Sequence, residues 1–272
     1  MLDTKFRKMK NSEALKKIVK DKYADIAMAP KTGGCCGSDD ECVDYSVFSE
    51  SYAAQPGYLK DADMGLGCGL PTEHANISKG DAVLDLGSGA GNDCFVARSI
   101  VGESGKVTGL DFTDEMLEKA NLNNKKLGYS NVDFVKGDIE SMPLPDSAYD
   151  IVISNCVLNL VPDKAKAFSE IYRVLNADGH FCISDVVLKG DLPEELREAA
   201  TLYAGCVSGA LQMEAYLKII EDAGFRNIEI KKAREIDVPD ALLLPYVTKE
   251  KLDAYRRTGA GIYSITLVAN KR

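Results

Sequence analysis

The stretch that decides the fold is Asp85-Leu-Gly-Ser-Gly-Ala-Gly91. The apolar residues Ala82, Val83 and Leu84 precede it and predict a buried strand, whereas residues 92–100 after it have the pattern of a helix. Glycines at alternating positions let the backbone turn sharply and let a ligand approach with no Cβ in the way. The stretch therefore predicts a ligand-binding loop between a strand and the N-terminus of a helix.

The positions of the glycines distinguish this loop from one that binds a dinucleotide. A dinucleotide fold favours G-x-G-x-x-G, with the pyrophosphate over the helix N-terminus. Here the pattern is G-x-G-x-G, and Asp85 stands two residues before Gly87, close to where a pyrophosphate would lie. That carboxylate suits a ligand with an ammonium group, such as the methionine part of S-adenosylmethionine. We therefore expect S-adenosylmethionine to bind at Asp85, Gly87, Ser88, Gly89 and Gly91; the alternative is a glycine-rich turn without a ligand.

Strand and helix patterns alternate from about residue 80 onward. The predicted strands are Ala82–Leu86, Val107–Asp111, Val132–Val135, Ile151–Asn155 and Phe181–Val187, with helices at Asp114–Leu127 and Lys164–Leu175. This alternation favours an α/β, Rossmann-like sheet of parallel strands joined by right-handed crossovers. Two later strands are predicted at Ile228–Ile236 and Ile262–Val268, and we expect the last to pair antiparallel at the sheet edge.

The same pattern divides the chain into three expected parts. Residues 1–75 contain glycine-rich loops that carry thiols, and we interpret them as a cover in front of the main fold. Residues 76–190 are expected to form the cofactor-binding domain, and residues 191–272 a C-terminal substrate-binding lobe with the final edge strands.

Polar residues follow the later predicted strands at their carboxyl ends, where ligands bind in such sheets. A carboxylate at Asp111 can accept hydrogen bonds from both ribose hydroxyls of a nucleoside, and Phe112 can stack on its adenine. Asp138 is placed to accept the exocyclic amine of adenine, and the backbone N–H of Ile139 to address a ring nitrogen. Asn155 ends the fourth strand, close to the transferable group. Together these positions strengthen the case for S-adenosylmethionine.

The bulk composition excludes several classes of partner. A formal net charge of −9 over 272 residues argues against nucleic acid, whose phosphates demand a basic surface. It also argues against an anionic membrane surface, and no apolar stretch approaches the length of a membrane span. Residues 1–10 lack the apolar core of a signal peptide. We therefore expect a cytoplasmic protein without nucleic-acid or membrane partners.

Eight cysteines need an explanation in a chain with no C-x-x-C pair. Permanent disulfides are not expected in a reducing compartment. Cys94, in a predicted helix, and Cys182, in a predicted strand, are interpreted as packing residues. The thiols in loops or at the sheet rim are Cys35, Cys36, Cys68, Cys156 and Cys206. If three of these converge they suit a soft centre such as trivalent arsenic, whose lone pair can attack a sulfonium methyl group; the alternative is that the thiols never meet.

The chain resembles arsenite S-adenosylmethionine methyltransferases over nearly its whole length. The residues that carry the resemblance are Gly65-Leu-Gly-Cys-Gly69, Leu84-Asp-Leu-Gly-Ser-Gly-Ala-Gly-Asn-Asp-Cys94, Ser154-Asn-Cys-Val-Leu-Asn-Leu-Val-Pro-Asp-Lys164, and Gly205-Cys206 followed by Gly209-Ala210. The resemblance implies a class I methyltransferase fold in which residues 191–272 bind arsenic. It also implies methyl transfer from S-adenosylmethionine to trivalent arsenic as a route of detoxification. We expect the chain to lack the further C-terminal domain of many members.

The resemblance also implies roles for individual thiols. In the family, thiols that correspond to Cys156 and Cys206 bind trivalent arsenic. The thiol that matches Cys68 supplies a third ligand, or forms a disulfide with an N-terminal thiol that keeps the product trivalent; here that thiol is Cys35 or the adjacent Cys36. The implied substrate is arsenite or its thiol conjugates, and the implied partner is a thiol reductant such as glutathione or thioredoxin. No permanently bound metal is expected.

Two other functions compete with arsenite methylation. A methyltransferase of a small organic molecule, with structural cysteines, would use a His, Glu or Lys base, and neither His74 nor His180 lies at a clear carboxyl strand end. A non-enzymatic arsenic-binding protein would not need Asp85, Asp111 and Asp138 at cofactor positions. Arsenite methylation is therefore the favoured function.

Overall fold

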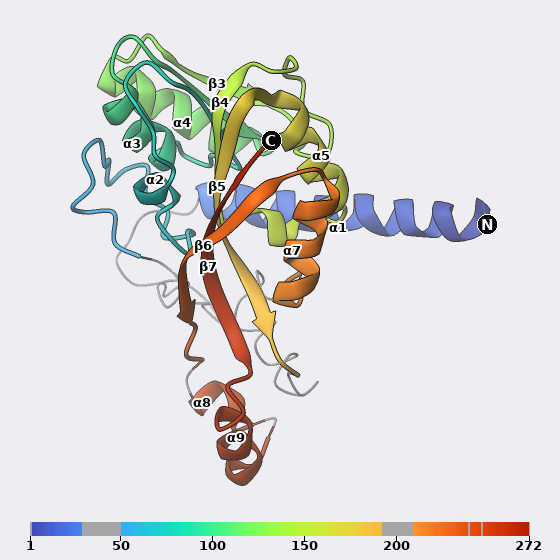
Figure 1. The fold of residues 1–272 in the computed structure, drawn as a ribbon. Coiled ribbons are helices and arrows are strands. Elements are labelled where there is room, and N and C mark those ends of the chain that lie inside the picture. Colours follow the sequence, from blue (N-terminus) through green and yellow to red (C-terminus); the bar gives the residue numbers. More distant parts are fainter. Residues whose placement is uncertain (1, 29–49, 192–208, 239, 246, 272) are drawn as a thin grey trace.

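The computed structural model describes residues 2–28, 50–191, 209–238, 240–245 and 247–271. Within these ranges the strands form one sheet in the order β3-β2-β1-β4-β5-β7-β6 (Figure 1). The strands are β1 Ala82–Leu86, β2 Lys106–Asp111, β3 Val132–Lys136, β4 Tyr149–Asn155, β5 Leu175–Lys189, β6 Arg226–Glu235 and β7 Gly261–Asn270. Neighbours among β1–β5 pair in parallel, which confirms the predicted α/β sheet.

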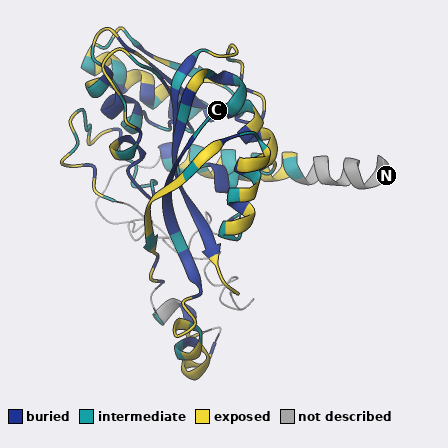
Figure 2. Ribbon diagram, viewed as in Figure 1, coloured by how far each residue is buried: buried dark blue, intermediate teal, exposed yellow. Residues whose placement is uncertain are grey.

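The position of the last strand differs from the prediction. β7 is antiparallel, as expected, but it lies between β5 and β6 rather than at the sheet edge. β6 forms the edge instead, and its side chains are mostly exposed (Figure 2). The reason lies in the burial of β7, where apolar residues such as Ile265 and Leu267 are fully covered. A strand that is covered in this way is stable with neighbours on both sides.

Helices cover both faces of the sheet (Figure 1). They are α1 Leu2–Met28, α2 Pro71–His74, α3 Asn92–Val101, α4 Asp114–Leu127, α5 Lys164–Val174, α7 Met213–Asp222, α8 Asp240–Leu243 and α9 Lys249–Arg256, with a 3₁₀ turn at Leu158–Leu160. In the described ranges no helix is long and apolar enough to cross a membrane.

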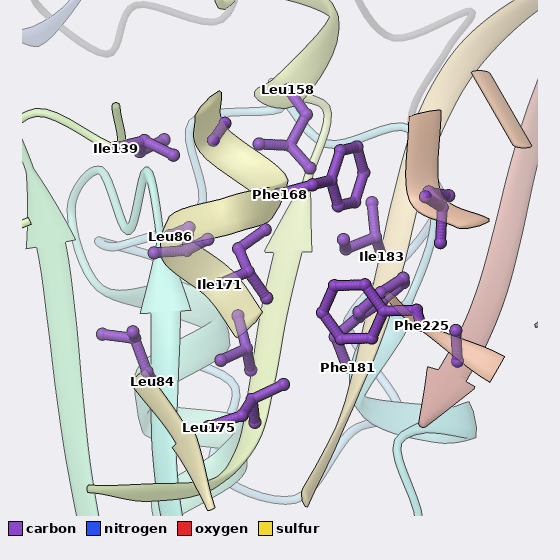
Figure 3. Close-up of a cluster of buried hydrophobic side chains, with 14 of the residues drawn as sticks. Leu84, Leu86, Ile139, Leu158, Phe168, Ile171, Leu175, Phe181, Ile183 and Phe225 are labelled. Carbon is purple, nitrogen blue, oxygen red and sulfur yellow. The ribbon is translucent and has the colours of Figure 1, made fainter. Parts of the chain in front are cut away.

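Alternate side chains of the strands build two different cores. Val83 belongs to a buried cluster with Phe95 of α3. Leu84 belongs to a second cluster with Phe168 of α5 and Tyr216 of α7, and Figure 3 shows Leu84 and Phe168 in it. This follows from the two-residue period of a strand, which sends successive side chains to opposite faces. Because both faces are covered, β1 is an unbroken apolar run up to Asp85.

A third, smaller core lies beyond the main sheet layers. The long ends of β5 and β7 extend toward α8 and α9, as Figure 1 shows. There Val186 and Ile262 pack with Leu252 of α9. Cys68 and Cys156 belong to the same buried cluster, which we call the thiol core. The fold therefore joins the predicted cofactor loop to a separate apolar region that holds two thiols.

Candidate functional site

A pocket opens at the carboxyl ends of the parallel strands, as the topology of such sheets predicts. All ten residues predicted to bind the cofactor lie at this end, and nine of them line the pocket: Asp85, Gly87, Ser88, Gly89, Asp111, Phe112, Asp138, Ile139 and Asn155. The tenth, Gly91, is the N-cap of α3. Cys156 lines the same pocket.

The glycine loop between β1 and α3 requires its glycines for conformation and for space. Gly87, Gly89 and Gly91 have φ of +67°, +50° and +95°, which is left-handed backbone that L residues with a Cβ rarely adopt. A Cβ at Gly87 would also lie 2.5 Å from a methyl carbon of Val157. The loop therefore places backbone, and no side chain, along the wall of the pocket at these positions.

Asp111 holds the glycine loop as well as facing the pocket. Its carboxylate accepts hydrogen bonds from the backbone N–H of Gly89 at 2.9 Å and of Thr113 at 2.8 Å. Burial raises the pKa of Asp111, and these N–H groups oppose that effect. The predicted ribose acceptor thus also joins two loops at the pocket wall, a role that the sequence pattern does not reveal.

Two further carboxyl groups line the pocket, the buried Asp85 and the half-buried Asp93. Asp85 accepts a hydrogen bond from the Cys94 thiol at 3.2 Å, and its pKa is raised by burial and then by the charge of Asp93. Burial raises the pKa of Asp93 to about 6. Two carboxyl groups that share a dry site repel each other when both are ionised. A cationic ligand relieves this repulsion, so the pocket favours positive charge.

Helix α1 contributes a part of the pocket that the sequence analysis missed. Lys16 donates to Asp138 Oδ2 at 2.7 Å and to Glu140 at 2.6 Å, and it lines the pocket. Asp138 Oδ1 also accepts from the backbone N–H of Glu140 at 2.9 Å. The predicted adenine acceptor therefore already has a lysine partner. A lone lysine on a long helix carries no pattern that would have identified it.

The residues present fit a nucleoside cofactor with an amino-acid tail. Ser88 Oγ and Asn92 Oδ1 are buried atoms of the pocket lining that have no hydrogen-bond partner among the described residues. Buried polar groups are costly when they are unpaired. A ligand that offers hydroxyl and amino groups would satisfy them beside the glycine loop.

Cys156 lines the pocket, and Cys68 belongs to the same buried cluster as Cys156. Both are buried in the thiol core. The charges of both thiolates would raise the pKa of the Tyr216 hydroxyl, although burial of that hydroxyl raises its pKa more. Cys156 adopts a left-handed backbone with φ of +61°, which is strained for a residue with a Cβ, and such strain often marks a functional position. Two of the predicted arsenic ligands thus lie in one buried cluster.

The remaining thiols divide into two groups. Cys94 and Cys182 are buried in the core between α3 and the sheet, as predicted, and burial raises the pKa of Cys182 to about 12. Cys35, Cys36, Cys42 and Cys206 lie outside the described residues. Their predicted roles therefore stay predictions.

A hydrogen-bonded trio links the pocket to the segment that carries Cys68. The Tyr52 hydroxyl lies 2.7 Å from Asp93 Oδ1, and the Asn155 amide donates to the same hydroxyl. Asn155 Oδ1 in turn accepts from the Cys68 N–H at 2.9 Å. Sequence reasoning placed Asn155 but missed Tyr52 and Asp93; Asp93 follows the glycine loop directly, which could have identified it.

The fold and the pocket define the class of protein. Residues 77–224 match the family of methyltransferase domains, and the chain belongs to that family. The arsenite methyltransferase of Halobacterium salinarum is 37% identical over 233 residues, which is 81% of this chain and 60% of that relative. The human arsenite methyltransferase is 41% identical over 169 residues, 58% of this chain and 44% of the relative. The chain thus spans about 60% or less of the length of these relatives.

Solved structures agree with these relatives. The crystal structure of an arsenic(III) S-adenosylmethionine methyltransferase from Chlamydomonas reinhardtii matches with a TM-score of 0.63 and 40% identity, covering 74% of this chain and 66% of that one. A Bacillus subtilis protein matches with a TM-score of 0.61 at 23% identity, which shows the fold alone. The predicted resemblance to arsenite methyltransferases is confirmed.

Proposed function

We propose that this protein transfers a methyl group from S-adenosylmethionine to trivalent arsenic held by Cys68, Cys156 and Cys206. The observation that carries the proposal is the meeting of Cys68 and Cys156 in one buried cluster beside the acidic cofactor pocket. Soft thiolates are the ligands that a thiophilic centre prefers. The likeness to arsenite methyltransferases of known structure and sequence supports the same substrate.

The described residues that follow Cys206 support its place in the ligand set. Gly209 lies so close to the backbone of Asn159 that a Cβ would meet the Asn159 oxygen at 1.8 Å. Ala210 is buried in the thiol core with Cys68 and Cys156. A segment of three residues spans at most about 10 Å. Because Cys206 stands three residues before Gly209 in the sequence, we propose it as the third ligand beside the thiol core.

The chemistry follows from the acids on one side and the thiols on the other. When bound, S-adenosylmethionine supplies an electrophilic methyl group on a positively charged sulfur. Asp85 and Asp93 favour that positive charge, and the thiols hold arsenic with its lone pair toward the pocket. The lone pair forms an arsenic–carbon bond while the sulfur–carbon bond breaks. Correct placement in line contributes several kcal/mol to such a displacement.

A thiol pair completes the reaction. Methylation raises the formal oxidation state of arsenic by two. We propose that an N-terminal thiol, Cys35 or Cys36, forms a disulfide with Cys68 as the sulfur–arsenic bond of Cys68 breaks, which leaves two electrons on arsenic and releases one proton from the N-terminal thiol. A cellular thiol such as glutathione or thioredoxin then reopens the disulfide by exchange. These steps need a reducing compartment, and we propose the cytoplasm for this reason.

The experiment that tests this function replaces single thiols. We expect Cys156→Ser and Cys206→Ser to lose binding and methylation of arsenite, because a hydroxyl is a far poorer ligand for a soft centre. Cofactor affinity should persist, because the pocket carboxylates are untouched. Cys182→Ser is the matched control and should methylate normally. Substantial methylation of arsenite and its monomethyl product by either ligand variant would contradict the three-thiolate site.

The geometry gives no support to an organic substrate that needs a histidine base. His180 Nε2 is bonded to the Ala75 carbonyl at 2.6 Å, in the middle of β5. His74 ends the short helix α2. Neither residue is among those that line the cofactor pocket.

A further inference from the structure

The segment that carries Cys68 is clamped by the side chain of Asn155. The Asn155 Oδ1 atom accepts hydrogen bonds from the backbone N–H of Cys68 at 2.9 Å and of Gly69 at 3.3 Å. The Nδ2 atom donates to the Gly69 carbonyl at 2.8 Å. Since the amide oxygen accepts and the amide nitrogen donates, only one orientation of the Asn155 amide satisfies all three bonds. The position of the Cys68 backbone therefore depends on that orientation.

The same segment has little room to move. A Cβ at Gly67 would lie 2.6 Å from Asn155 Nδ2, and one at Gly69 would lie 2.5 Å from Ser184 Oγ. The Ser264 hydroxyl also donates to the Cys68 carbonyl at 2.6 Å. Close packing of this kind transmits a shift of one neighbour to the next. A change at Asn155 is thus felt at Cys68.

Tyr52 links Asn155 to Asp93 by short hydrogen bonds, beside a longer direct bond from Asn155 Nδ2 to Asp93 Oδ2 at 3.3 Å. Its hydroxyl is buried, accepts from Asn155 Nδ2, and lies 2.7 and 2.9 Å from the two carboxylate oxygens of Asp93. An ionised carboxylate only accepts, so the Tyr52 proton then points to Asp93 and its oxygen lone pair toward Asn155. If Asp93 carries a proton, the Tyr52 hydroxyl can turn to the Gly69 carbonyl, which lies 3.2 Å away. Tyr52 would then compete with Asn155 for that carbonyl.

The ionisation of Asp93 responds to charge in the pocket. Both Asp85 and Asp93 line it, and burial raises the pKa of each. A cation bound between the glycine loop and these acids favours the ionised form. Cofactor charge thereby selects the arrangement in which Tyr52 donates to Asp93 and Asn155 clamps the Cys68 segment.

We infer that Tyr52 is a positioning residue through which a positively charged cofactor orders Cys68, so that trivalent arsenic binds more tightly to the cofactor-loaded protein. This inference rests on the proposed function, because arsenic is taken as the ligand of Cys68. It adds that the two binding sites are coupled and identifies the side chain that couples them. By linkage, arsenic must raise the affinity for the charged cofactor by the same factor.

The test compares arsenite affinity of the full chain in three states: alone, with S-adenosylhomocysteine, and with sinefungin. Sinefungin carries an amine where S-adenosylmethionine has its sulfonium, and it transfers no methyl group, whereas S-adenosylhomocysteine is neutral at that position. At pH 5, below the Asp93 pKa of about 6, we expect sinefungin to tighten arsenite binding by about fivefold to tenfold, because few molecules hold Asp93 ionised without it, and S-adenosylhomocysteine to do so less. Tyr52→Phe should remove most of the sinefungin effect, so that its arsenite affinity differs little with and without sinefungin.

Tyr58→Phe is the matched control. Its hydroxyl also donates to a carboxylate, but to that of Asp63, at 3.1 Å, and not to that of Asp93; it should keep the full sinefungin effect. Equal arsenite affinity of the parent protein with sinefungin and with S-adenosylhomocysteine would overturn the role of charge, even if Tyr52→Phe failed to fold. A full sinefungin effect in folded Tyr52→Phe would overturn the role of Tyr52. Failure of the parent protein to bind arsenite in any state would instead refute the proposed function.

Discussion

Asp111 shows how one side chain contributes to both folding and binding. Its two oxygens hold the backbone of Gly89 and Thr113, which fixes the glycine loop against the start of α4. A carboxylate oxygen can accept more than one hydrogen bond, and Asp111 lines the pocket. A change at Asp111 therefore affects the shape of the pocket and its hydrogen bonds to a ligand together, and a conservative substitution separates the two better than alanine.

We expect Asp111→Asn to weaken cofactor binding by about tenfold to a hundredfold. Loss of a hydrogen bond to a charged group costs about 1.5–3 kcal/mol, and about 1.4 kcal/mol is tenfold in affinity. Isothermal titration with S-adenosylhomocysteine measures the change. Asp133→Asn, at an exposed carboxylate that pairs with Lys106, is the control. Unchanged affinity in Asp111→Asn would mean that Asp111 only holds the loop.

The buried thiols of Cys94 and Cys182 should be dispensable for methylation. In Cys94→Ser the new hydroxyl can still donate to Asp85, as the thiol does at 3.2 Å. In Cys182→Ser a hydroxyl enters an apolar cluster, and we expect a loss of about 1–3 kcal/mol in the free energy of unfolding. Urea unfolding and a methylation assay at a permissive temperature check both. Loss of arsenic binding by a folded variant would place that thiol in the site.

At the scale of elements, β7 is the strand that completes the molecule. It pairs along its length with β5 on one side and with β6 on the other. One of its faces covers the core that contains Phe225 and Phe181, which Figure 3 shows. The edge strand β6 is exposed and rich in charge, as edge strands that avoid aggregation often are.

Because β7 is more buried than β6, substitution of an apolar residue by alanine should lower the free energy of unfolding more in β7 than in β6. Leu267 of β7 is fully buried, whereas Ile230, its partner in register on β6, is 37% exposed. We expect Leu267→Ala to lower the free energy of unfolding by about 2–5 kcal/mol, as for other buried leucines. Ile230→Ala should cost well under half of that. Urea denaturation of both variants tests the comparison, and equal losses would contradict the observed place of β7.

At the scale of the whole molecule, the excess of acid is not only on the surface. Three carboxylates that are almost fully buried, Asp85, Asp111 and Asp185, lie at the carboxyl side of the sheet. Asp185 of β5 accepts a hydrogen bond from Tyr216 of α7 at 2.9 Å, and burial raises its pKa to about 6. The folded state therefore holds this proton more tightly than the unfolded chain does.

Asp185 should make the protein less stable as pH rises. Its pKa is about 6 in the folded state against an ordinary 3.8, so its contribution is full below pH 3.8 and is lost as pH rises through about 6. A shift of this size corresponds to about 3 kcal/mol. Asp185→Asn should flatten this part of the stability–pH curve, and Asp237→Asn, at an exposed side chain, should not. Urea unfolding between pH 4 and 8 measures the free energy of unfolding of both proteins. If it changes with pH in the same way in Asp185→Asn and in the parent, Asp185 does not cause the loss of stability.

Much of the cofactor half of the protein is predictable from local pattern. The β1 prediction, Ala82–Leu86, agrees with the structure at both ends, and so does α4 at Asp114–Leu127. The gathering of Asp85, Asp111 and Asn155 follows because parallel strands bring their carboxyl ends to one edge. For the same reason Cys156, next to Asn155, had to lie at the pocket rim.

Contacts between distant segments follow from no local pattern. The pairing of β7 with both neighbours depends on which strand edges remain free after the parallel strands have paired. The sequence of β7 alone is compatible with an edge position and with an interior position in the sheet. Lys16 reaches Asp138 only because α1 packs across the pocket. Tyr52 meets Asp93 and Asn155 only because residues 52, 93 and 155 are brought together by the folded chain.

The sequence by itself determined the α/β sheet, the glycine loop and the acids of the pocket, because each depends on a few consecutive residues. The meeting of Cys68 with Cys156, and the buried link from Cys68 to the pocket, were decided by tertiary packing, because burial sets which distant polar groups must find each other.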